Sequence, residues 1–291
     1  MDITYENNNL ILKNPSDFKL CDIFDCGQCF RWNFCEDGSY EGVALGRALK
    51  IKQEENRVIF FETSEKDFKD IWYDYFDMGR DYGAVRRNLA GDEKLLSAFE
   101  FGTGIRILRQ QLWECIVSFI ISASNNIPRI KKIVELFCSE FGEKIEYMGK
   151  VRYAFPTPER TAELSCEDLA VIRAGFRDKY ILDAAQKFLT DNEMSYENLS
   201  SVSTVQAKKI LMRINGVGEK VADCVLLFGL GKYDSFPVDV WMKRIMEMCY
   251  FGGEKQSIKT ISEFASRHFG DLGGFAQQYL FFYARENKLG V

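Results

Sequence analysis

The sequence lacks several features that would place the protein in a membrane or outside the cell. It has no run of about 18 uninterrupted apolar residues, the length that a membrane-spanning helix needs. Its start, MDITYENNNLILKN, lacks the basic and apolar regions of a secretory signal. The nine cysteines are odd in number and irregularly spaced, unlike a disulfide framework. We therefore expect a cytoplasmic protein with reduced thiols.

The chain also lacks the excess of positive charge found in proteins that wrap nucleic acid. Its net charge at pH 7 is −5, from 38 Lys and Arg residues against 43 Asp and Glu residues. The acidity is confined to the first third, because residues 1–100 have a net charge of −7 and residues 101–291 a net charge of +2. A surface for nucleic acid in the last two thirds would accordingly be local.

What the chain does have is a change of hydrophobic period near Ser64. Residues 1–65 alternate apolar with polar residues or are rich in β-branched and aromatic types, which predicts strands. Most later segments carry apolar residues at helical spacing. We expect N-caps at Ser64 and Asp92, a helix that starts at Pro128, and a loop over residues 149–164.

These periods predict an α+β protein. An antiparallel sheet domain with flanking helices, residues 1–100, is expected to precede an all-helical body, residues 101–291. Within the body, middle helices are expected over about 111–195, and a helix-hairpin-helix motif with the C-terminal helices over about 200–291.

Cys26 and Cys29 form a CxxC pair around Gly27 in the segment DCGQCFRWN. A zinc or redox site is a weak interpretation, because the chain has no second CxxC and no obvious helix follows this one. Gly27 permits another group to approach the backbone closely.

The most informative stretch is Leu211–Trp241, LMRINGVGEKVADCVLLFGLGKYDSFPVDVW. Two helical segments flank a turn in which Gly216 and Gly218 permit positive φ and a tight link. The N–H groups at the start of the second helix form a site for an anion such as a DNA phosphate. An ordinary turn between two helices explains the same pattern, so the glycines alone leave both interpretations open.

A lysine and an aspartate accompany this turn. Lys220 lies in the first turn of the second helix, where the macrodipole and apolar neighbours both favour the neutral amine of a nucleophile. Asp239 follows 19 residues later at a predicted helix start. There it can cap the helix and also stabilise positive charge that develops on a sugar ring. A solvated surface lysine and an ordinary N-cap are the simpler explanations.

The segment GVGEKVADC followed by PVDV resembles the helix-hairpin-helix DNA glycosylase superfamily, with its Gly/Pro-rich loop and aspartate. The wider sequence resembles the 8-oxoguanine DNA glycosylase branch through CGQCFRW, SNNIPRI, GFRDKY and FAQQYLFF. The resemblance covers most of the chain. It implies an enzyme that flips a damaged nucleotide out of duplex DNA and excises its base.

In that family the lysine attacks the sugar, expels the base and forms a Schiff base that permits β-elimination of the strand. The resemblance assigns this role to Lys220, and it assigns to Asp239 the stabilisation of the oxocarbenium-like state. It implies no required cofactor, and no metal takes part in the chemistry. The partner is double-stranded DNA containing 8-oxoguanine, and we expect a monomer that is associated with the nucleoid if the source is a prokaryote.

The resemblance also assigns the base-binding residues. The backbone carbonyl of Gly27 would accept the N7 hydrogen of the oxidised guanine, and Gln277 would hydrogen-bond its Watson–Crick edge. Phe281 would stack on one face of the base and Cys224 would face the other. Without the resemblance, an exposed amide and a core aromatic would be the simpler interpretations of Gln277 and Phe281.

A further set of residues is implied in contacts with DNA. Phe176 would fill the gap beside the flipped base, and Arg129 and Arg177 would contact the estranged cytosine. The remaining contacts with the opposite strand or with phosphates fall on Asn125, Gly216, Gly218 and Trp241. The backbone carbonyls of Met212, Ile214 and Val217 can hold a structural Na⁺ or K⁺ against a phosphate.

The chain departs from the family pattern at several positions. Ser124 replaces an asparagine that helps animal members recognise cytosine, so we expect weaker discrimination of the opposite base. Asn215 replaces the usual proline before the first hairpin glycine, and Trp241 replaces a histidine that contacts phosphate. Only Cys249 follows Cys224, so the four-cysteine iron–sulfur loop of related glycosylases is missing.

Two other functions remain open at this point. One is a related glycosylase for another lesion such as an alkylated base, although Lys220 argues against the branches that use water. The other is a helix-hairpin-helix module that binds DNA structure without chemistry. Such a module requires neither the pair of Lys220 and Asp239 nor a base pocket.

Overall fold

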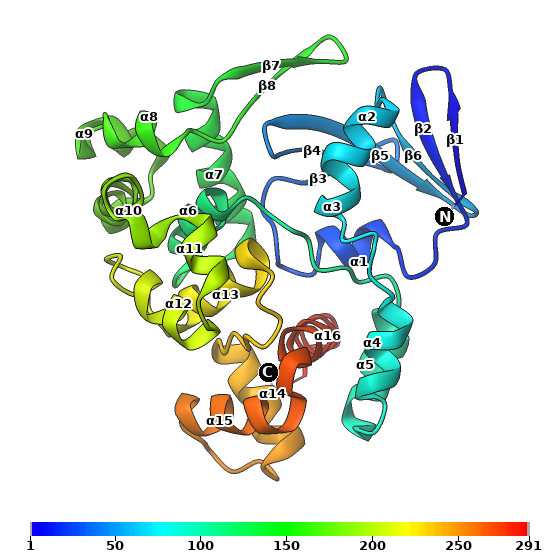
Figure 1. The fold of residues 1–291 in the computed structure, drawn as a ribbon, viewed down its shortest axis with the longest axis vertical. Helices are drawn as coiled ribbons and strands as arrows, with labels where there is room; N and C mark the ends of the chain where they lie inside the picture. Colours follow the sequence, from blue (N-terminus) through cyan, green and yellow to red (C-terminus); the bar gives the residue numbers. More distant parts are fainter. Residues whose placement is uncertain (1, 290–291) are drawn as a thin grey trace.

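The computed structural model describes residues 2–289, and a six-stranded antiparallel sheet forms the first part of the described chain (Figure 1). The strand order is β1-β2-β6-β5-β4-β3. Leu10 of β2 pairs with Phe60 of β6, and both side chains are buried. The strands are β1 (Asp2–Glu6), β2 (Asn9–Lys13), β3 (Asn33–Phe34), β4 (Ser39–Ala44), β5 (Arg47–Glu54) and β6 (Arg57–Phe60). The predicted antiparallel sheet is confirmed.

Short helices pack against this sheet and complete its core. The rings of Phe24 and Trp32 stack with centroids 4.2 Å apart, and Ser64 caps the next helical segment as expected, accepting from the N–H of Asp67. The prediction of strands throughout residues 1–65 is wrong at α1, because five residues show too little of a helical period. The helical segments are α1 (Leu20–Phe24), α2 (Glu65–Asp67), η1 (Phe68–Trp72) and α3 (Tyr73–Tyr75).

Two helices that precede residue 102 belong to the core of the helical body. They are α4 (Tyr82–Leu89) and α5 (Glu93–Phe101). Their apolar side chains share one buried cluster with the later helices, whereas the sheet has a cluster of its own. Asp92 caps α5 as expected. The expected division at residue 100 grouped these helices with the sheet, but by packing they lie with the body.

The rest of the described chain is mainly helical. Pro128 lies in the first turn of α7 as predicted, where Asn126 caps the helix by accepting from the N–H of Arg129. The elements are α6 (Leu112–Ser122), α7 (Ile127–Phe141), α8 (Pro158–Ala162), α9 (Cys166–Leu169), η2 (Ala170–Ile172), η3 (Gly175–Arg177), α10 (Asp178–Thr190), η4 (Asn192–Met194), α11 (Tyr196–Ser201), α12 (Thr204–Leu211), α13 (Glu219–Leu230), α14 (Val240–Tyr250), α15 (Ile258–Phe269), η5 (Gly270–Leu272) and α16 (Gly273–Glu286).

A β-hairpin interrupts the helices and joins the two parts of the molecule. It consists of β7 (Lys144–Tyr147) and β8 (Lys150–Tyr153). The prediction of a loop over residues 149–164 is wrong at β8 and at α8, which both lie within it. The hydroxyl of Tyr147 donates to the Phe61 carbonyl at 2.8 Å and accepts from the backbone N–H of Lys50 at 3.0 Å. These bonds to the sheet domain help to fix its position relative to the body.

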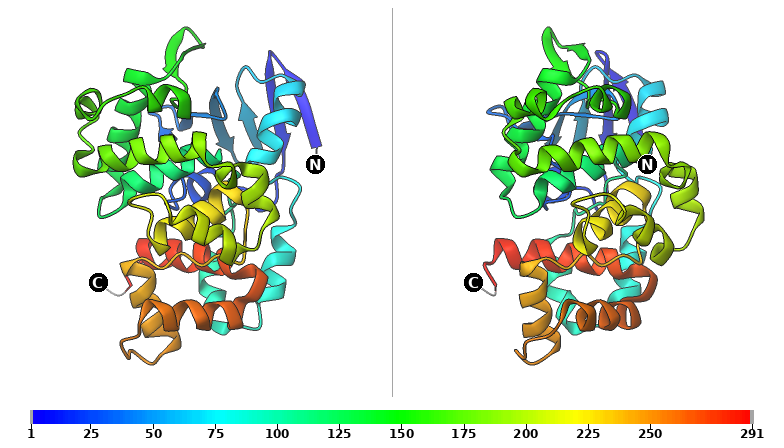
Figure 2. Two further views of the ribbon diagram at one scale, coloured as in Figure 1. Left: turned by 60° about the vertical axis from the view of Figure 1, so that its left-hand side comes forward. Right: turned by 90° about the vertical axis from the view of Figure 1, so that its left-hand side faces the viewer.

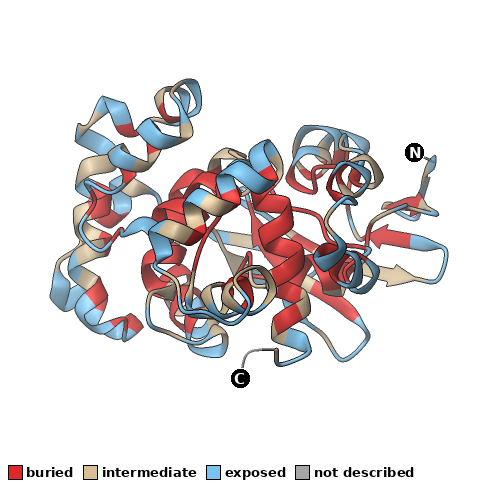
Figure 3. Ribbon diagram, turned by 90° about the horizontal axis from the view of Figure 1, so that it is seen from below, coloured by how far each residue is buried: buried red, intermediate tan, exposed pale blue. Residues whose placement is uncertain are grey.

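The two ends of the molecule differ in structure. In Figures 1 and 2 the β7–β8 hairpin lies at one end, while α14 and α15 lie at the opposite end. Buried residues concentrate in the helices at the centre of the view in Figure 3. Residues 221–229 of α13 are all buried, so this helix forms the centre of the body. None of the helices within residues 2–289 is both long and apolar enough to cross a membrane.

Candidate active site

The hairpin between α12 and α13 is held in one conformation. Gly216 has φ of +84°, and a Cβ added there would lie 2.3 Å from Cδ2 of Tyr180, so only glycine fits. Gly218 has φ of −89° and serves as the N-cap of α13, so the expectation of positive φ is wrong for this residue. Asp183 accepts from the backbone N–H of Asn215 at 2.7 Å and from its side chain at 2.9 Å.

The N-terminus of α13 is open to a ligand. Gly218 offers no side chain to cap the helix, and an added Cβ there would meet no atom within 4 Å. The first N–H groups of α13 therefore remain available to an anion, and the helix dipole favours negative charge at this point. A groove of about 550 Å³ lies beside them and is lined by Ser122, Ala123, Ser124, Asn125, Gly216, Gly218, Lys220, Val221, Val238, Asp239, Val240, Trp241, Lys243 and Ile258.

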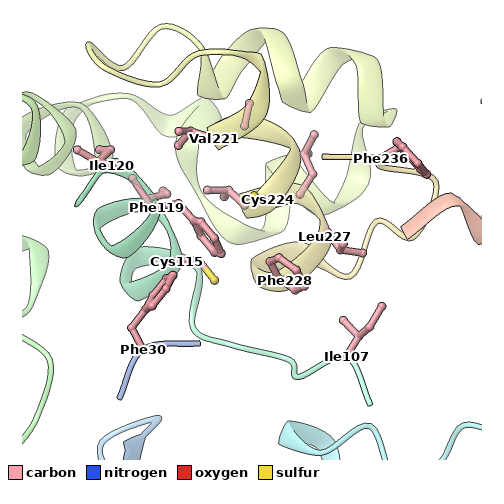
Figure 4. Close-up of a cluster of buried hydrophobic side chains, with 14 of the residues drawn as sticks. Phe30, Ile107, Cys115, Phe119, Ile120, Val221, Cys224, Leu227, Phe228 and Phe236 are labelled. Carbon is pink, nitrogen blue, oxygen red and sulfur yellow. The ribbon is translucent and has the colours of Figure 1, made fainter. Parts of the chain in front are cut away.

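Lys220 is half-buried at the floor of this groove. Its ammonium nitrogen lies 5.2 Å from the centroid of the Phe119 ring, which supports the cation by its π face. Phe119 comes from α6 and stacks on Phe228 of α13, with centroids 5.5 Å apart. Figure 4 shows these two rings and Cys224 between the two helices. The sequence analysis missed Phe119, because an aromatic residue in an apolar helix reads as ordinary core.

Asp239 is fixed by the helix that it starts. Its Oδ1 atom accepts from the backbone N–H of Met242 at 2.7 Å, which confirms the expected N-cap of α14. Asp239 and Lys220 line both the groove and a smaller cavity beneath it. No ion pair between them occurs in the described part of the chain. The carboxylate and the amine thus face a common space in which a substrate can lie between them.

The smaller cavity brings together all four residues assigned to the base. Gly27, Cys224, Gln277 and Phe281 line it with Lys220, Asp239 and five others, Cys26, Phe119, Phe228, Pro237 and Gln278. Gln277 is only 5% exposed, and its Oε1 atom is buried without a hydrogen-bond partner. A buried unpaired amide oxygen is costly, so its position in a cavity points to a ligand that supplies a donor.

The cavity is closed to a base in this conformation. Its volume is about 40 Å³, which admits water but is far too small for a purine. Phe281 occupies the space beside Gly27, since a Cβ added to Gly27 would lie 3.1 Å from its Cε1 atom. A purine can therefore enter only after the Phe281 ring moves away from the Gly27 backbone.

The cysteines around the cavity are packing residues. Burial raises the pKa of the Cys224 thiol to about 11, although Lys220 opposes the shift, so the thiol stays protonated at neutral pH. Cys26 and Cys29 of the CxxC pair contribute to different cores, Cys26 to that of the body and Cys29 to that of the sheet. Burial raises the pKa of Cys26 to about 12. Both Cys26 and Cys29 are free thiols, and no group of three or more His, Cys, Asp or Glu side chains within residues 2–289 could hold a metal ion.

The side chains assigned to the opposite strand differ in how far they are exposed, and among Phe176, Arg177, Arg129 and Asn125 only Asn125 lines the groove. Phe176 is 63% exposed, as a side chain that inserts into DNA must be. Arg177 is buried instead, and its guanidinium donates to the carbonyls of Ala123 and Ala174. Arg129 is exposed, while Asn125 donates to the Ile121 carbonyl at 3.1 Å. As the structure stands, Arg177 has no surface free for a base.

Trp241 and the hairpin carbonyls complete the set. Trp241 lines the groove, with the Arg244 guanidinium 6.0 Å from its ring centroid. Met212, Ile214 and Val217 all lie in the turn between α12 and α13, where the Ile214 carbonyl accepts from the N–H of Val217 at 3.1 Å. A carbonyl oxygen has a second lone pair, so this bond leaves Ile214 able to coordinate a cation.

Two protein families match this chain in consecutive segments. The N-terminal domain of 8-oxoguanine DNA glycosylase matches residues 10–116. The HhH-GPD superfamily of base excision DNA repair proteins matches residues 117–268, more than half of the chain. The chain belongs to the HhH-GPD superfamily. The groove, the hairpin and the pair of Lys220 and Asp239 all lie within the segment that this superfamily matches.

Individual members of the superfamily are similar over nearly the whole chain. The N-glycosylase/DNA lyase of Saccharomyces cerevisiae is 32% identical and covers 85% of this chain and 73% of its own. The structure of the Clostridium acetobutylicum 8-oxoguanine glycosylase/lyase, in complex with DNA containing cytosine opposite 8-oxoguanine, is 42% identical with a TM-score of 0.95. The structure of MBOgg1 with a low-affinity DNA ligand is 49% identical, also with a TM-score of 0.95. Both structures match over 99% of each chain.

Proposed function

We propose that this protein is a bifunctional DNA glycosylase that excises 8-oxoguanine from duplex DNA and then cleaves the strand at the resulting abasic site. The observation that carries the proposal is the closed cavity in which Lys220, Asp239 and the unpartnered amide of Gln277 meet. A nucleophile, a carboxylate and a base-reading amide are the groups that base excision requires. The similarity to the glycosylase/lyase of Clostridium acetobutylicum over 99% of both chains supports it.

The chemistry follows from the positions of two side chains. With the nucleotide flipped into the cavity, the neutral amine of Lys220 attacks C1′ of the sugar. The bond between C1′ and N9 breaks, and its electron pair leaves with the base. Asp239 stabilises the positive charge that develops on the sugar. Proton loss from the amine and opening of the ring give a Schiff base. Transfer of a C2′ proton to solvent then breaks the 3′ C–O bond, and the 3′ phosphate leaves with the electron pair of that bond.

Recognition uses groups from both parts of the chain. The Gly27 carbonyl accepts the N7 hydrogen that 8-oxoguanine has and guanine lacks, and Gln277 pairs with the Watson–Crick edge. Phe281 moves from its place beside Gly27 and stacks on the base, opposite Cys224.

The groove and the hairpin hold the DNA. The N–H groups that follow Gly218 bind a phosphate, and the carbonyls of Met212, Ile214 and Val217 bind a monovalent cation beside it. Arg177 contacts the estranged base only after it leaves the carbonyls that it now binds. Phe176 fills the space in the duplex, an insertion that its exposure permits.

The nucleophile and the stabilising carboxylate are both side chains of this chain, Lys220 and Asp239. We therefore propose that catalysis needs no cofactor, and full activity after dialysis against a chelator is the expected result. Because the substrate is DNA, we propose that the protein acts in the cytoplasm, and that it is associated with the nucleoid if the source is a prokaryote.

The test is reductive trapping of the Schiff base. With borohydride and duplex DNA containing 8-oxoguanine, the intact protein should form a covalent adduct that is lost in Lys220→Gln. Lys209→Gln is the matched control, because Lys209 is an exposed lysine on the neighbouring helix α12. It should form the adduct at the normal rate.

A panel of lesions separates the remaining alternatives. An adduct with DNA containing an alkylated base but not with 8-oxoguanine would identify a related glycosylase. Binding to DNA without an adduct on any lesion would identify a module that recognises DNA structure, and it would refute the Schiff-base mechanism.

A further inference from the structure

The loop that carries Gly27 presents four consecutive backbone carbonyls, and three of them are bound by side chains from other elements. The Asp25 carbonyl accepts from the Arg285 guanidinium. The Cys26 carbonyl accepts from Nε2 of Gln278 at 2.9 Å. The Gln28 carbonyl accepts from Nε2 of Gln110 at 2.7 Å. Across residues 2–289 no hydrogen bond to the Gly27 carbonyl is found.

The bound carbonyls on either side of Gly27 help to fix the backbone there, because glycine has little conformational preference of its own. Gly27 has φ of +84°, which glycine tolerates but does not select. The Cys26 carbonyl belongs to the peptide group that precedes Gly27, and the Gln28 carbonyl to the second peptide group after it, so binding both holds the backbone on each side of this residue. The direction of the Gly27 carbonyl thus depends on the donors that hold its neighbours.

Gln278 is the donor best placed for this role. It is 2% exposed and adjoins Gln277 on α16, so two neighbouring amides serve the same cavity from one helix. The amide of Gln277 leaves its oxygen unpaired in the cavity, whereas the amide of Gln278 holds the backbone. A buried hydrogen bond from a helix fixes geometry better than one from a mobile loop.

We propose that Gln278 is a positioning residue that sets the selectivity for 8-oxoguanine, by holding the Cys26 carbonyl so that the Gly27 carbonyl faces N7 of the base. This inference rests on the proposed function. The N7 atom of guanine is an acceptor, so a carbonyl that faces it is repelled, whereas the N7 hydrogen of 8-oxoguanine donates to the same carbonyl. A carbonyl free to turn loses both the attraction and the repulsion.

Gln278→Met tests the proposal, because methionine is unbranched, similar in length and unable to donate a hydrogen bond. Single-turnover excision of 8-oxoguanine should fall roughly tenfold, which corresponds to about 1.4 kcal/mol, as expected for one buried hydrogen bond. Cleavage of a preformed abasic site should stay within about twofold of normal, because no base is read in that step.

Two further measurements make the test specific. In a Lys220→Gln background, Gln278→Met should reduce the ratio of affinities for 8-oxoguanine DNA and for undamaged DNA. Gln110→Met should show the same split between excision and abasic-site cleavage, because it releases the carbonyl on the other side of Gly27. Gln53→Met is the control, since Gln53 binds the Phe18 carbonyl and the Leu20 N–H in the sheet domain, away from the cavity.

The possible outcomes are distinguishable. Failure of the unaltered protein to excise 8-oxoguanine would count against the proposed function and not against Gln278 alone. Normal excision with an unchanged affinity ratio in both Gln278→Met and Gln110→Met would overturn the positioning role. So would an equal loss of excision and abasic-site cleavage in both variants, because that result assigns these amides to general stability.

Discussion

Replacing Asp239 with asparagine separates its observed role as an N-cap from its proposed electrostatic role. The structure shows that Asp239 caps α14 through a 2.7 Å bond from the Met242 N–H, and that it lines the cavity with Lys220. Asparagine is as good an N-cap as aspartate, so Asp239→Asn keeps the helix start and removes only the charge. We expect its thermal unfolding midpoint to match that of the unaltered protein.

The effect on excision should be large. At about 4 Å and an effective dielectric constant of about 20, two unit charges attract by roughly 4 kcal/mol. A sugar that carries most of a unit charge in the transition state would then lose about 3 kcal/mol of stabilisation, or a factor of about 10² in rate. The single-turnover excision rate of Asp239→Asn on 8-oxoguanine DNA measures this loss directly.

Asp239→Ala and a distant cap provide the controls. Asp239→Ala removes the charge and the cap together, so it should lose a further ~1 kcal/mol of stability, a shift of roughly 2 °C in the unfolding midpoint. Thr157→Ala removes the cap of α8, which accepts from the Arg160 N–H at 3.1 Å, and should lower stability without changing excision. An Asp239→Asn rate within about threefold of normal would refute the electrostatic role and leave only the cap.

Three further predictions concern the base pocket and the core. Excision of 8-oxoguanine should be appreciable opposite bases other than cytosine, because Ser124 stands where animal members of the family have an asparagine. Excision rates measured with all four opposite bases test this. A preference for cytosine as strict as that of the animal members would contradict it. Gly27→Ala should lower 8-oxoguanine excision by more than about tenfold while sparing abasic-site cleavage, because the new Cβ would lie 3.1 Å from the Phe281 ring at a positive φ; equal rates would show that the loop adapts. Glu114→Gln should stabilise the protein above neutral pH, because burial raises the pKa of Glu114 to about 7 from its usual 4.5. The folded state therefore binds the proton of Glu114 more tightly than the unfolded state does. The stability that this proton contributes is fully present below the unfolded pKa and is lost as the pH rises to about 7. The total loss is roughly 3 kcal/mol. Chemical denaturation of both proteins at about pH 4 and about pH 8 checks this, and an unchanged difference between them would rule it out.

Elements with strong local signals were predictable from the sequence. The caps at Ser64, Asp92 and Asp239 and the helix start at Pro128 are confirmed, because an N-cap depends on a side chain and the backbone two or three residues later. The short helix α1 and the β7–β8 hairpin were missed. Five-residue elements have little period of their own, and the hairpin is held by Tyr147 against the distant sheet.

The candidate site also contains residues that could be predicted from the sequence and residues that could not. The catalytic role of Lys220 could be proposed from the sequence because the glycine hairpin, the lysine and the aspartate follow one another within a single short stretch. Phe119 and Gln278 were not recognisable, because an apolar ring on α6 and an amide on α16 have no distinctive neighbours in sequence. Arg177 was assigned to the opposite strand, but in the structure it is buried and donates to the backbone carbonyls of Ala123 and Ala174. Only packing between elements decides whether such a side chain is free.

The sequence by itself determined the fold class, the family and the chemical half of the site, because hydrophobic period, capping and the hairpin motif are local properties of the chain. Only the tertiary structure decided that Gly27 meets α16, that the Phe281 ring closes the cavity, and that the carbonyls beside Gly27 are already bound. These facts depend on contacts between residues some 250 positions apart, such as Cys26 and Gln278, which lie 252 positions apart. No local pattern encodes the distance between two such residues.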